Sequence, residues 1–431
     1  MVRFLTFVSL LVFLTTPAMA LTVEDAIKTA ADQSHELKQM RLEVEAARWN
    51  EVQSFAGHLP KLDFNANHIF SERFEELEVA FGGASVIVPA IQPYTSLGVG
   101  ASVELFGGFK TSSLARAAHL DWESKTHRLT RAEQQTRAQI RTMFYQALGS
   151  QVLVTVAEQN IQTLENHMKD VSSRERGGVS TRFDTLRVDV QLEEARSERM
   201  LAQSRVITAR ARLFQALGIT DDGKPLEGQL PEDFSHYDLA KMDLSATTRE
   251  DRAAQVLDIE RGENMVRVAN SHWYPALRLY GSSEWYNNYN HAIFEDDGER
   301  FKSAYMIAVS LKWNLYDGGA SNAAAQTARL EKQIANERLA RLDQSLPVDI
   351  EDSKNRLAYD IATFKAKQSS VRKAEEAVRL AKGALKAGAL TNTEVLDAVL
   401  DLNRAKASAV KAQVDAVDDL GKLELALGRV L

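Results

Sequence analysis

The sequence contains no cysteine in 431 residues. Disulfide bonds, cysteine-ligated metals, thiol catalysis and a lipid-modified N-terminal cysteine are therefore excluded. The chain also has no HExxH or GxSxG motif, and its nine histidines show no paired metal-ligand spacing. The turn at 218–224 resembles a phosphate-binding loop, but Pro225 stands where Ser or Thr would bind the metal. We expect a protein without enzymatic activity, cofactor or metal.

Long apolar runs are scarce as well. Residues 1–20 hold one, in which Arg3 precedes the apolar segment 4–14 and Ala18-Met19-Ala20 forms a small-x-small cleavage pattern. We interpret residues 1–20 as a cleaved signal peptide, because the apolar segment is too short to span a bilayer; the alternative is an uncleaved anchor. No later apolar stretch approaches eighteen residues, so a membrane location would require a barrel.

The charges are nearly balanced. Without Arg3, 51 basic residues remain against 59 acidic ones, a net charge of −8. A mildly acidic chain is a poor candidate for nucleic acid or an anionic lipid surface. No nucleic-acid partner is expected.

An internal repeat is the most informative feature that the chain does have. Four segments of the first half recur in the same order in the second half, at a spacing of 210 residues or a few more. The pairs are GVSTRFDTL (178–186) with GALTNTEVL (388–396), LFQALG (213–218) with LELALG (423–428), LPKLDF (59–64) with YPALRL (274–279), and VELFGG (103–108) with WNLYDGG (313–319). We interpret the chain as a tandem duplication.

Each half has the same predicted plan: a helix, a proline, two strand-like runs, Gly-Gly, a very long helix, a glycine turn and a final helix. The predicted parts are the signal peptide (1–20), a first repeat (21–218) with a strand pair at 59–106 and a turn near 177–182, an equatorial linker (219–246), and a second repeat (247–431) with a strand pair at 275–316 and a turn near 387–392. The stretch 110–175 has no proline and one glycine. As one helix it would be about 100 Å long, which indicates an elongated molecule.

The expected helix-packing positions between Leu402 and Leu420 are mostly Ala, Ser and Val. Small residues let helices approach closely along a long, shallow seam. The alternative, an ordinary dimeric coiled coil, would carry Leu and Ile at sustained a and d positions.

The four strand-like runs alternate between apolar and polar residues, as Leu97, Val99 and Ala101 do with Ser96 and Gly98. Each run is about ten residues long, enough for a tilted strand to cross a bilayer. Tyr and Trp cluster near the second pair, and such side chains suit the water–lipid interface. The predicted lipid-interface aromatics are Tyr280, Trp285, Tyr305 and Trp313. The alternative is a hydrophobic core beneath a soluble sheet, for which the helices offer no matching apolar layer.

Four strands cannot close a barrel, and open sheet edges are not tolerated in hydrocarbon. The smallest single barrels have about eight strands and a filled interior. Two copies of the chain would give such a filled tube, whereas three would give twelve strands and an open lumen. We therefore expect at least three copies to assemble in the membrane.

Together these features resemble the TolC-type outer membrane factor (outer membrane efflux protein) family. The most specific segments are Leu59-Pro60, Tyr274-Pro275, Phe106-Gly107-Gly108, Tyr316-Asp317-Gly318-Gly319 and the two glycine turns. The resemblance covers the whole mature chain and implies a mainly α fold with β. In it, tandem-duplicated long helical hairpins form an α-barrel, and four strands per chain contribute to a trimeric 12-stranded transmembrane β-barrel.

The resemblance also implies a function. Family members are homotrimeric exit channels in the outer membrane of Gram-negative bacteria, with a large periplasmic part. They serve tripartite efflux pumps or type I secretion systems and dock onto a periplasmic adaptor (membrane fusion) protein and an inner-membrane pump. The alternative is a soluble periplasmic coiled-coil scaffold that binds partners through its helices. The cargo cannot be predicted from these features.

The same resemblance assigns roles to the turns, which it places at the periplasmic tips. The adaptor-contact residues would be Gly178, Ser180, Thr181, Arg182, Gly388, Leu390 and Thr391. Asp184, Glu394 and Asp397 would form a cation-selective gate ring, where crowding of like charges should raise some pKa values. Leu390 stands where a well-studied family member has a basic residue that holds the closed state together. Arg182, in the first turn, could take over that role. The alternative is that these acids are solvated helix-start residues.

Overall fold

The computed structural model describes residues 20–68, 76–89, 95–234, 237, 239, 249–287 and 301–431. Residues 1–19 of the predicted signal peptide and most of 235–248 in the predicted linker lie outside the described residues. The chain forms two compact units, one comprising 1–42, 128–252 and 342–431 and the other comprising 43–127 and 253–341. Each unit therefore draws on both halves of the sequence.

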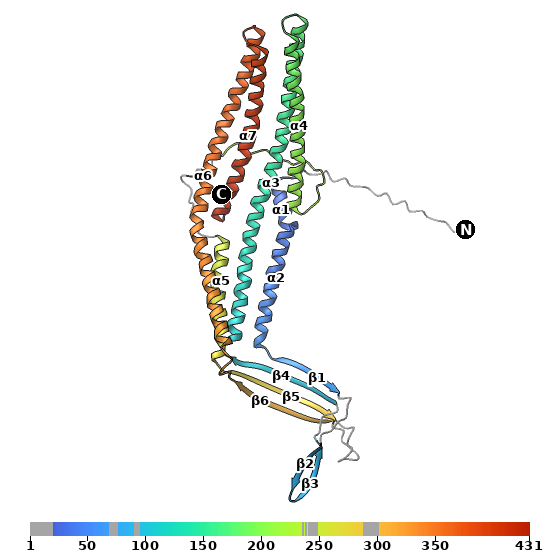
Figure 1. The fold of residues 1–431 in the computed structure, drawn as a ribbon, viewed down its shortest axis with the longest axis vertical. Helices are drawn as coiled ribbons and strands as arrows, with labels where there is room; N and C mark the ends of the chain where they lie inside the picture. Colours follow the sequence, from blue (N-terminus) through green and yellow to red (C-terminus); the bar gives the residue numbers. More distant parts are fainter. Residues whose placement is uncertain are drawn as a thin grey trace, which may run out of the picture. The chain divides into compact units, whose positions relative to one another are not determined.

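Helices make up most of the described chain (Figure 1). They are α1 (Val23–Gln33), α2 (His35–Phe55), α3 (Lys110–Arg176), α4 (Arg182–Leu217), α5 (Glu250–Asn270), α6 (Ala320–Lys386) and α7 (Asn392–Leu427), with short 3-10 turns at Ala56–His58 and Ser271–Trp273. The long helices come in matched sizes, because α3 and α6 each have 67 residues and α4 and α7 each have 36. Within the part of the chain that the structure describes, no helix combines the length and hydropathy needed to cross a membrane.

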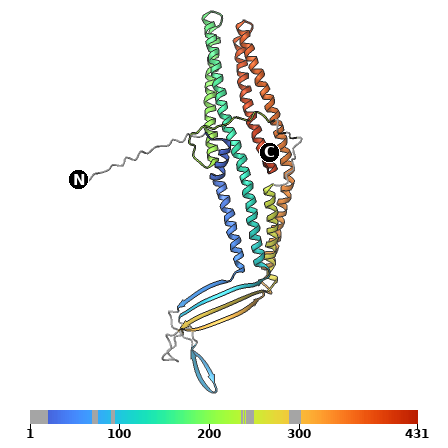
Figure 2. The same cartoon turned by 180° about the vertical axis from the view of Figure 1, so that it is seen from behind.

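In the first unit, two helical hairpins carry the core. α3 runs alongside α4, and α6 runs alongside α7, in both views (Figures 1 and 2). Phe144 of α3 and Leu213 of α4 are buried with alanines of α1, while Leu357 of α6 is buried with Leu423 of α7. Alanine and valine fill many of the remaining buried positions, which permits close helix packing.

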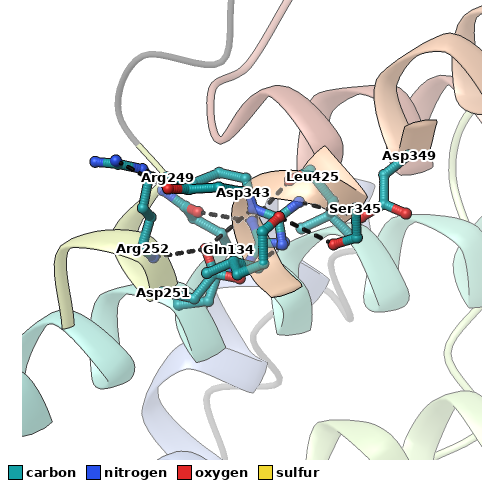
Figure 3. Close-up of polar contacts among 10 residues, drawn as sticks. Gln134, Arg249, Asp251, Arg252, Asp343, Ser345, Asp349 and Leu425 are labelled. Carbon is teal, nitrogen blue, oxygen red and sulfur yellow. Dashed lines mark hydrogen bonds and ion pairs between the residues drawn. The ribbon is translucent and has the colours of Figure 1, made fainter. Parts of the chain in front are cut away.

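A polar network in this unit connects α3, the residues at the start of α5, α6 and α7 (Figure 3). Arg249, only 8% exposed, donates to Asp251 at 2.6 Å and lies 3.5 Å from Asp349. Arg131 of α3 donates to the carbonyl of Leu425 at 2.7 Å. Burial alone would raise the pKa of Asp251, but its hydrogen bond and charge interaction with Arg249 bring the pKa below its usual value. Arg249 is therefore a buried cation that is paired with partly exposed carboxylates.

A second polar contact joins α6 to α7, where Asp360 hydrogen-bonds Asp419 and faces Asp415. Burial, that hydrogen bond and repulsion raise the pKa of Asp360 to about 6. A carboxyl group with a raised pKa adds stability at low pH, and this is lost as the pH rises through the folded-state value.

We expect Asp360→Asn to stabilise the protein at pH 8, because Asn keeps a hydrogen-bonding group without the charge. The gain should be on the order of 1 kcal/mol, since partial exposure screens the charge. It should disappear at pH 5, where Asp360 is already protonated. Thermal unfolding at both pH values measures this, with the exposed Asp401→Asn on α7 as the control. Equal effects of the two substitutions at both pH values would contradict it.

The second unit contains a four-stranded antiparallel sheet in the order β1-β4-β5-β6. Its strands are β1 (Lys61–His68), β4 (Thr95–Gly107), β5 (Ala276–Asn287) and β6 (Lys302–Lys312). Phe70, expected to continue the first strand, lies outside the described residues. A separate hairpin of β2 (Glu76–Phe81) and β3 (Ala84–Pro89) turns at Gly82 and Gly83. The structure is thus mainly helical with a four-stranded sheet, as expected, but the small hairpin was not predicted.

Candidate functional site

The first of the two glycine turns connects α3 to α4. Gly178 adopts a φ of 72°, and the amide of Val179 donates to the carbonyl of Arg174 at 2.9 Å, which closes the end of α3. Thr181 then caps α4: its hydroxyl accepts from the amide of Asp184, whose carboxylate accepts from the amide of Thr181 at 2.9 Å. Each group of this capping box satisfies an otherwise unpaired helix-end donor.

The second turn, between α6 and α7, repeats the first. Gly388 adopts a φ of 76°, and the amide of Ala389 donates to the carbonyl of Ala384 at 2.9 Å. Thr391 and Glu394 form the capping box, with the Thr391 amide 2.7 Å from the Glu394 carboxylate. The two turns therefore have the same backbone design.

The other predicted tip residues surround these caps. Ser180 is half-buried and donates from its hydroxyl to Asp184 at 3.1 Å. Leu390, its counterpart in the second turn, is also half-buried. Arg182 is exposed at the first residue of α4, and Asp397 is exposed in the second turn of α7.

Within one chain, capping hydrogen bonds set the pKa values of two of the turn acids. Hydrogen bonds from the backbone and side chain of Thr181 lower the pKa of Asp184, and those from Thr391 lower the pKa of Glu394. Their contribution to stability is therefore present at neutral pH and is lost as the pH falls through the lowered pKa. Within one chain, both carboxylates act as helix caps.

A buried polar contact links the two hairpins close to these turns. His167 of α3 is 3% exposed and lies 2.6 Å, Nε2 to Oδ1, from Asn392 at the start of α7. The side-chain amide of Asn392 donates to the carbonyl of Asp184 at 3.2 Å. Burial lowers the pKa of His167, against a smaller opposing effect of its hydrogen bond to Asn392. We call His167 and Asn392 the hairpin latch.

The four-stranded sheet has one apolar and one polar face. Directly paired residues of neighbouring antiparallel strands lie on the same face. The register places Phe64, Val99, Leu279 and Val309 on the same side of the sheet. The apolar residues of this side are Leu62, Phe64, Ala66, Leu97, Val99, Ala101, Val103, Phe106, Leu277, Leu279, Trp285, Tyr305, Ile307, Val309 and Leu311. The opposite side carries Asp63, Asn65, Ser102, Arg278, Ser282, Glu284 and Lys302 among others. Many of the apolar side chains are exposed, including Tyr305 at 87% and Ile307 at 79%.

The register places the four predicted interface aromatics on different faces of the sheet or next to it. Trp285 and Tyr305 lie on the apolar face, and Trp313 is exposed just after β6. Tyr280, however, pairs with Ser102 and Ala308 and lies on the polar face with Arg278. Tyr280 therefore lies on the opposite face from Trp285 and Tyr305.

The strand-to-helix junction explains why Gly-Gly follows the second strand run. A β-bulge between Glu104 and Phe106 shifts the register, so that Phe106 pairs with Leu277. Gly108 then adopts a φ of 64°, and a Cβ there would lie 2.6 Å from the carbonyl of Ser271. Only glycine fits this close approach.

Comparison with known proteins gives a match to one family model and to solved structures of similar fold. The profile of the outer membrane efflux protein family matches residues 26–219 and 244–429. The alkaline protease secretion protein AprF of Pseudomonas aeruginosa is 24% identical over 202 residues, which are 45% of this chain and 38% of AprF. The match therefore spans well under half of that relative.

Solved structures share the fold at low identity. A membrane protein from Pseudomonas aeruginosa superimposes with a TM-score of 0.78 at 20% identity, covering 94% of this chain and 92% of that one. The open state of the MtrE outer membrane channel of Neisseria gonorrhoeae gives a TM-score of 0.72 at 21% identity, covering 94% and 89%.

Proposed function

Because the chain belongs to the outer membrane efflux protein family, we propose that it is the outer-membrane exit channel of a tripartite efflux pump or type I secretion system. Three copies would each contribute four strands to a twelve-stranded barrel and two hairpins to a helical barrel. Cargo would pass through the shared lumen. The duct is passive, and its partners are a periplasmic adaptor protein, an inner-membrane pump and outer-membrane lipid.

The two-faced sheet is the observation that carries this proposal. Many of its apolar side chains are exposed, and β1 and β6 are the edge strands of the sheet in a single chain. In a barrel, the apolar face would contact lipid and the polar face, with Arg278 and Glu284, would line an aqueous lumen. Edge strands of neighbouring copies would pair, which satisfies their backbone groups in the bilayer.

A soluble periplasmic scaffold is the competing function. Its sheet would have to cover the apolar face with protein, yet Ile307, Val309 and Leu311 on β6 are all exposed. Membrane fractionation separates the two: a scaffold is released by salt, whereas a barrel requires detergent.

At the helical turns, the proposed roles are adaptor contact and gating. Gly178, Ser180, Thr181, Arg182, Gly388, Leu390 and Thr391 would form the adaptor-contact tips. Asp184, Glu394 and Asp397 would form the acidic ring of the periplasmic mouth when three copies come together. Exposed Asp397 fits this role best, because Asp184 and Glu394 are already held by their capping threonines.

Neutralising the second-hairpin acids tests the gate. Glu394→Gln keeps the capping box, because Gln also serves at that position, so that only the charge is removed. Combined with Asp397→Asn, it should lower the cation preference of single channels in planar bilayers by at least about twofold and raise the open fraction.

The matched control is Asp401→Asn, which removes an exposed charge one helical turn further along α7. It should leave selectivity close to that of the unmodified channel. Unchanged cation preference and opening in the double variant would reject the gate role but not the channel.

A further inference from the structure

The polar face of the four-stranded sheet carries its charges unevenly. Its end next to the helices presents Lys61, the first residue of β1, Arg278 of β5 and Lys312, the last residue of β6. Further along the same face, the charged residues include the acids Asp63 and Glu284. The end of the polar face that adjoins the helices is therefore its basic end.

A pocket of about 520 Å³ lies at this basic end. Lys61, Lys110 and Arg278 line it together with a single acid, Glu104. Ser102 of β4 and the residues at the end of α2 complete much of the wall. All of these residues belong to the second unit. We call this cavity, in which three positive charges face one negative charge, the junction pocket.

The three cations of the junction pocket are not neutralised within the described part of the chain, where none of them forms an ion pair. Glu104 lies opposite Arg278 in the β4–β5 register, but its carboxylate accepts a hydrogen bond from the hydroxyl of Thr111 at 2.9 Å. Lys61, Lys110 and Arg278 are all exposed. Their charges are therefore available to a solute in the pocket.

The charge of Lys110 is unfavourable for its own helix. Lys110 is the first residue of α3, whose first turn contains no acid, and the N-terminal end of a helix already carries partial positive charge. The matching helix α6 begins 210 residues later with Ala320, and Asp317 before it accepts hydrogen bonds from backbone amides. The residue 210 positions before Asp317 is Gly107. Helix stability therefore explains the negative charge of the second junction but not the positive charge of the first.

Oxyanions have the chemistry that suits these groups. An arginine side chain binds a carboxylate or phosphate through two parallel hydrogen bonds, and lysines add point charges around it. Rings of arginine and lysine select anions and phosphates in pores. Because the junction pocket lies on the face opposite the exposed apolar residues, its ligand would be a solute in water and not a lipid chain.

We propose that the junction pocket binds carboxylate or phosphate groups of anionic cargo through Lys61, Lys110 and Arg278. Binding to one pocket needs only a single chain. In the exit channel proposed above, on which this part of the inference rests, three pockets form a basic ring in the lumen. The acids of the helical turns belong to the first unit, so the two charged features can be altered independently.

Block of single channels by small oxyanions tests the pocket. Inorganic pyrophosphate supplies phosphate groups and citrate supplies carboxylates, and we expect both to reduce the conductance in planar bilayers. Lys61→Gln with Arg278→Gln should raise the half-blocking concentration at least about fivefold. Block of the unmodified channel should weaken as the salt concentration rises above about 0.1 M, where exposed charges are screened over about 10 Å.

Lys302→Gln is the matched control, because Lys302 lies on the same polar face at the other end of β6. Its half-blocking concentration should stay within about twofold of the unmodified value. Block that is equal in the double variant and the unmodified channel would overturn the pocket, as would an effect of Lys302→Gln as large as that of the double variant.

Lys110→Gln separates binding from folding. It should weaken the block but leave thermal stability unchanged or slightly raised, since it removes an unfavourable charge from the start of α3. A loss of thermal stability would show that Lys110 has a structural role and would contradict its assignment to the ligand.

Calorimetric titration of the detergent-solubilised protein with pyrophosphate distinguishes the possible failures. Normal channels without block or binding would overturn the junction pocket and leave the channel intact. A protein that forms no channel but binds pyrophosphate, with binding lost in the double variant, would overturn the channel and its ring and support the pocket. Absence of both channel and binding would overturn both proposals.

Discussion

Leu279→Arg is expected to prevent stable insertion of the protein into the outer membrane. Leu279 is the fourth residue of β5 and lies on the apolar face, paired with Val103 and Val309. A lipid-facing arginine costs up to about 2–4 kcal/mol, depending on its depth in the bilayer, and a trimer would incur this cost three times. The measurement is the detergent-extractable, membrane-bound fraction after expression, together with the yield of folded trimer.

Tyr280→Arg provides a depth-matched control for this prediction. Tyr280 is the next residue along β5 but lies on the polar face, where an additional arginine would enter an aqueous lumen. This variant should insert and assemble like the unmodified protein. Equal loss with both substitutions, or normal insertion with both, would contradict the assignment of the two faces.

Asn392→Leu is expected to destabilise the region of the helical turns by about 2–4 kcal/mol. Leu resembles Asn in size but leaves buried His167 and the carbonyl of Asp184 without the partner that Asn392 supplies. An unsatisfied buried polar group costs about 1–3 kcal/mol. Hydrogen exchange of the first turns of α4 and α7 should rise, while exchange in the four-stranded sheet should not change.

A double variant and a change of pH separate this effect from general damage. His167→Leu combined with Asn392→Leu removes both side-chain partners and should recover much of the lost stability, since paired removal is tolerated better than single removal.

The pH dependence follows from the lowered pKa of His167. Lys382 of α6 and Arg174 of α3 disfavour its protonation, and Asp170 of α3 favours it. The latch is therefore fully formed above pH 6.5, the ordinary histidine pKa, and weakens as the pH falls through the lowered value. Exchange at the turns should rise at acid pH in the unmodified chain but not in the double variant. Equal acid sensitivity of both would exclude His167 as the cause.

The repeated features of the fold could be predicted from the sequence, because they depend on local signals. Proline and glycine mark the helix ends, and the Gly178 and Gly388 turns lie at the expected places with left-handed backbone angles. The alternation of apolar and polar residues predicts the four strands of the sheet. The face of Tyr280 could also have been predicted from the sequence, because the polar residues Arg278 and Ser282 lie two positions away on either side and therefore share its face.

Long-range polar contacts could not be predicted in this way. His167 and Asn392 are 225 residues apart, and neither residue type in its helix signals a buried pair. Arg249 and Asp349 belong to no recognisable motif and meet only through helix packing. The β2–β3 hairpin did carry a local signal, Gly82-Gly83 between two apolar runs, which is typical of a two-residue turn.

The most direct test of the proposed channel is the mass of the protein extracted from outer membranes in mild detergent. Native mass spectrometry should find three chains in one detergent-dependent particle, because four strands close no barrel by themselves. A single chain that remains soluble in detergent-free buffer, with its sheet intact and no affinity for micelles, would contradict the account.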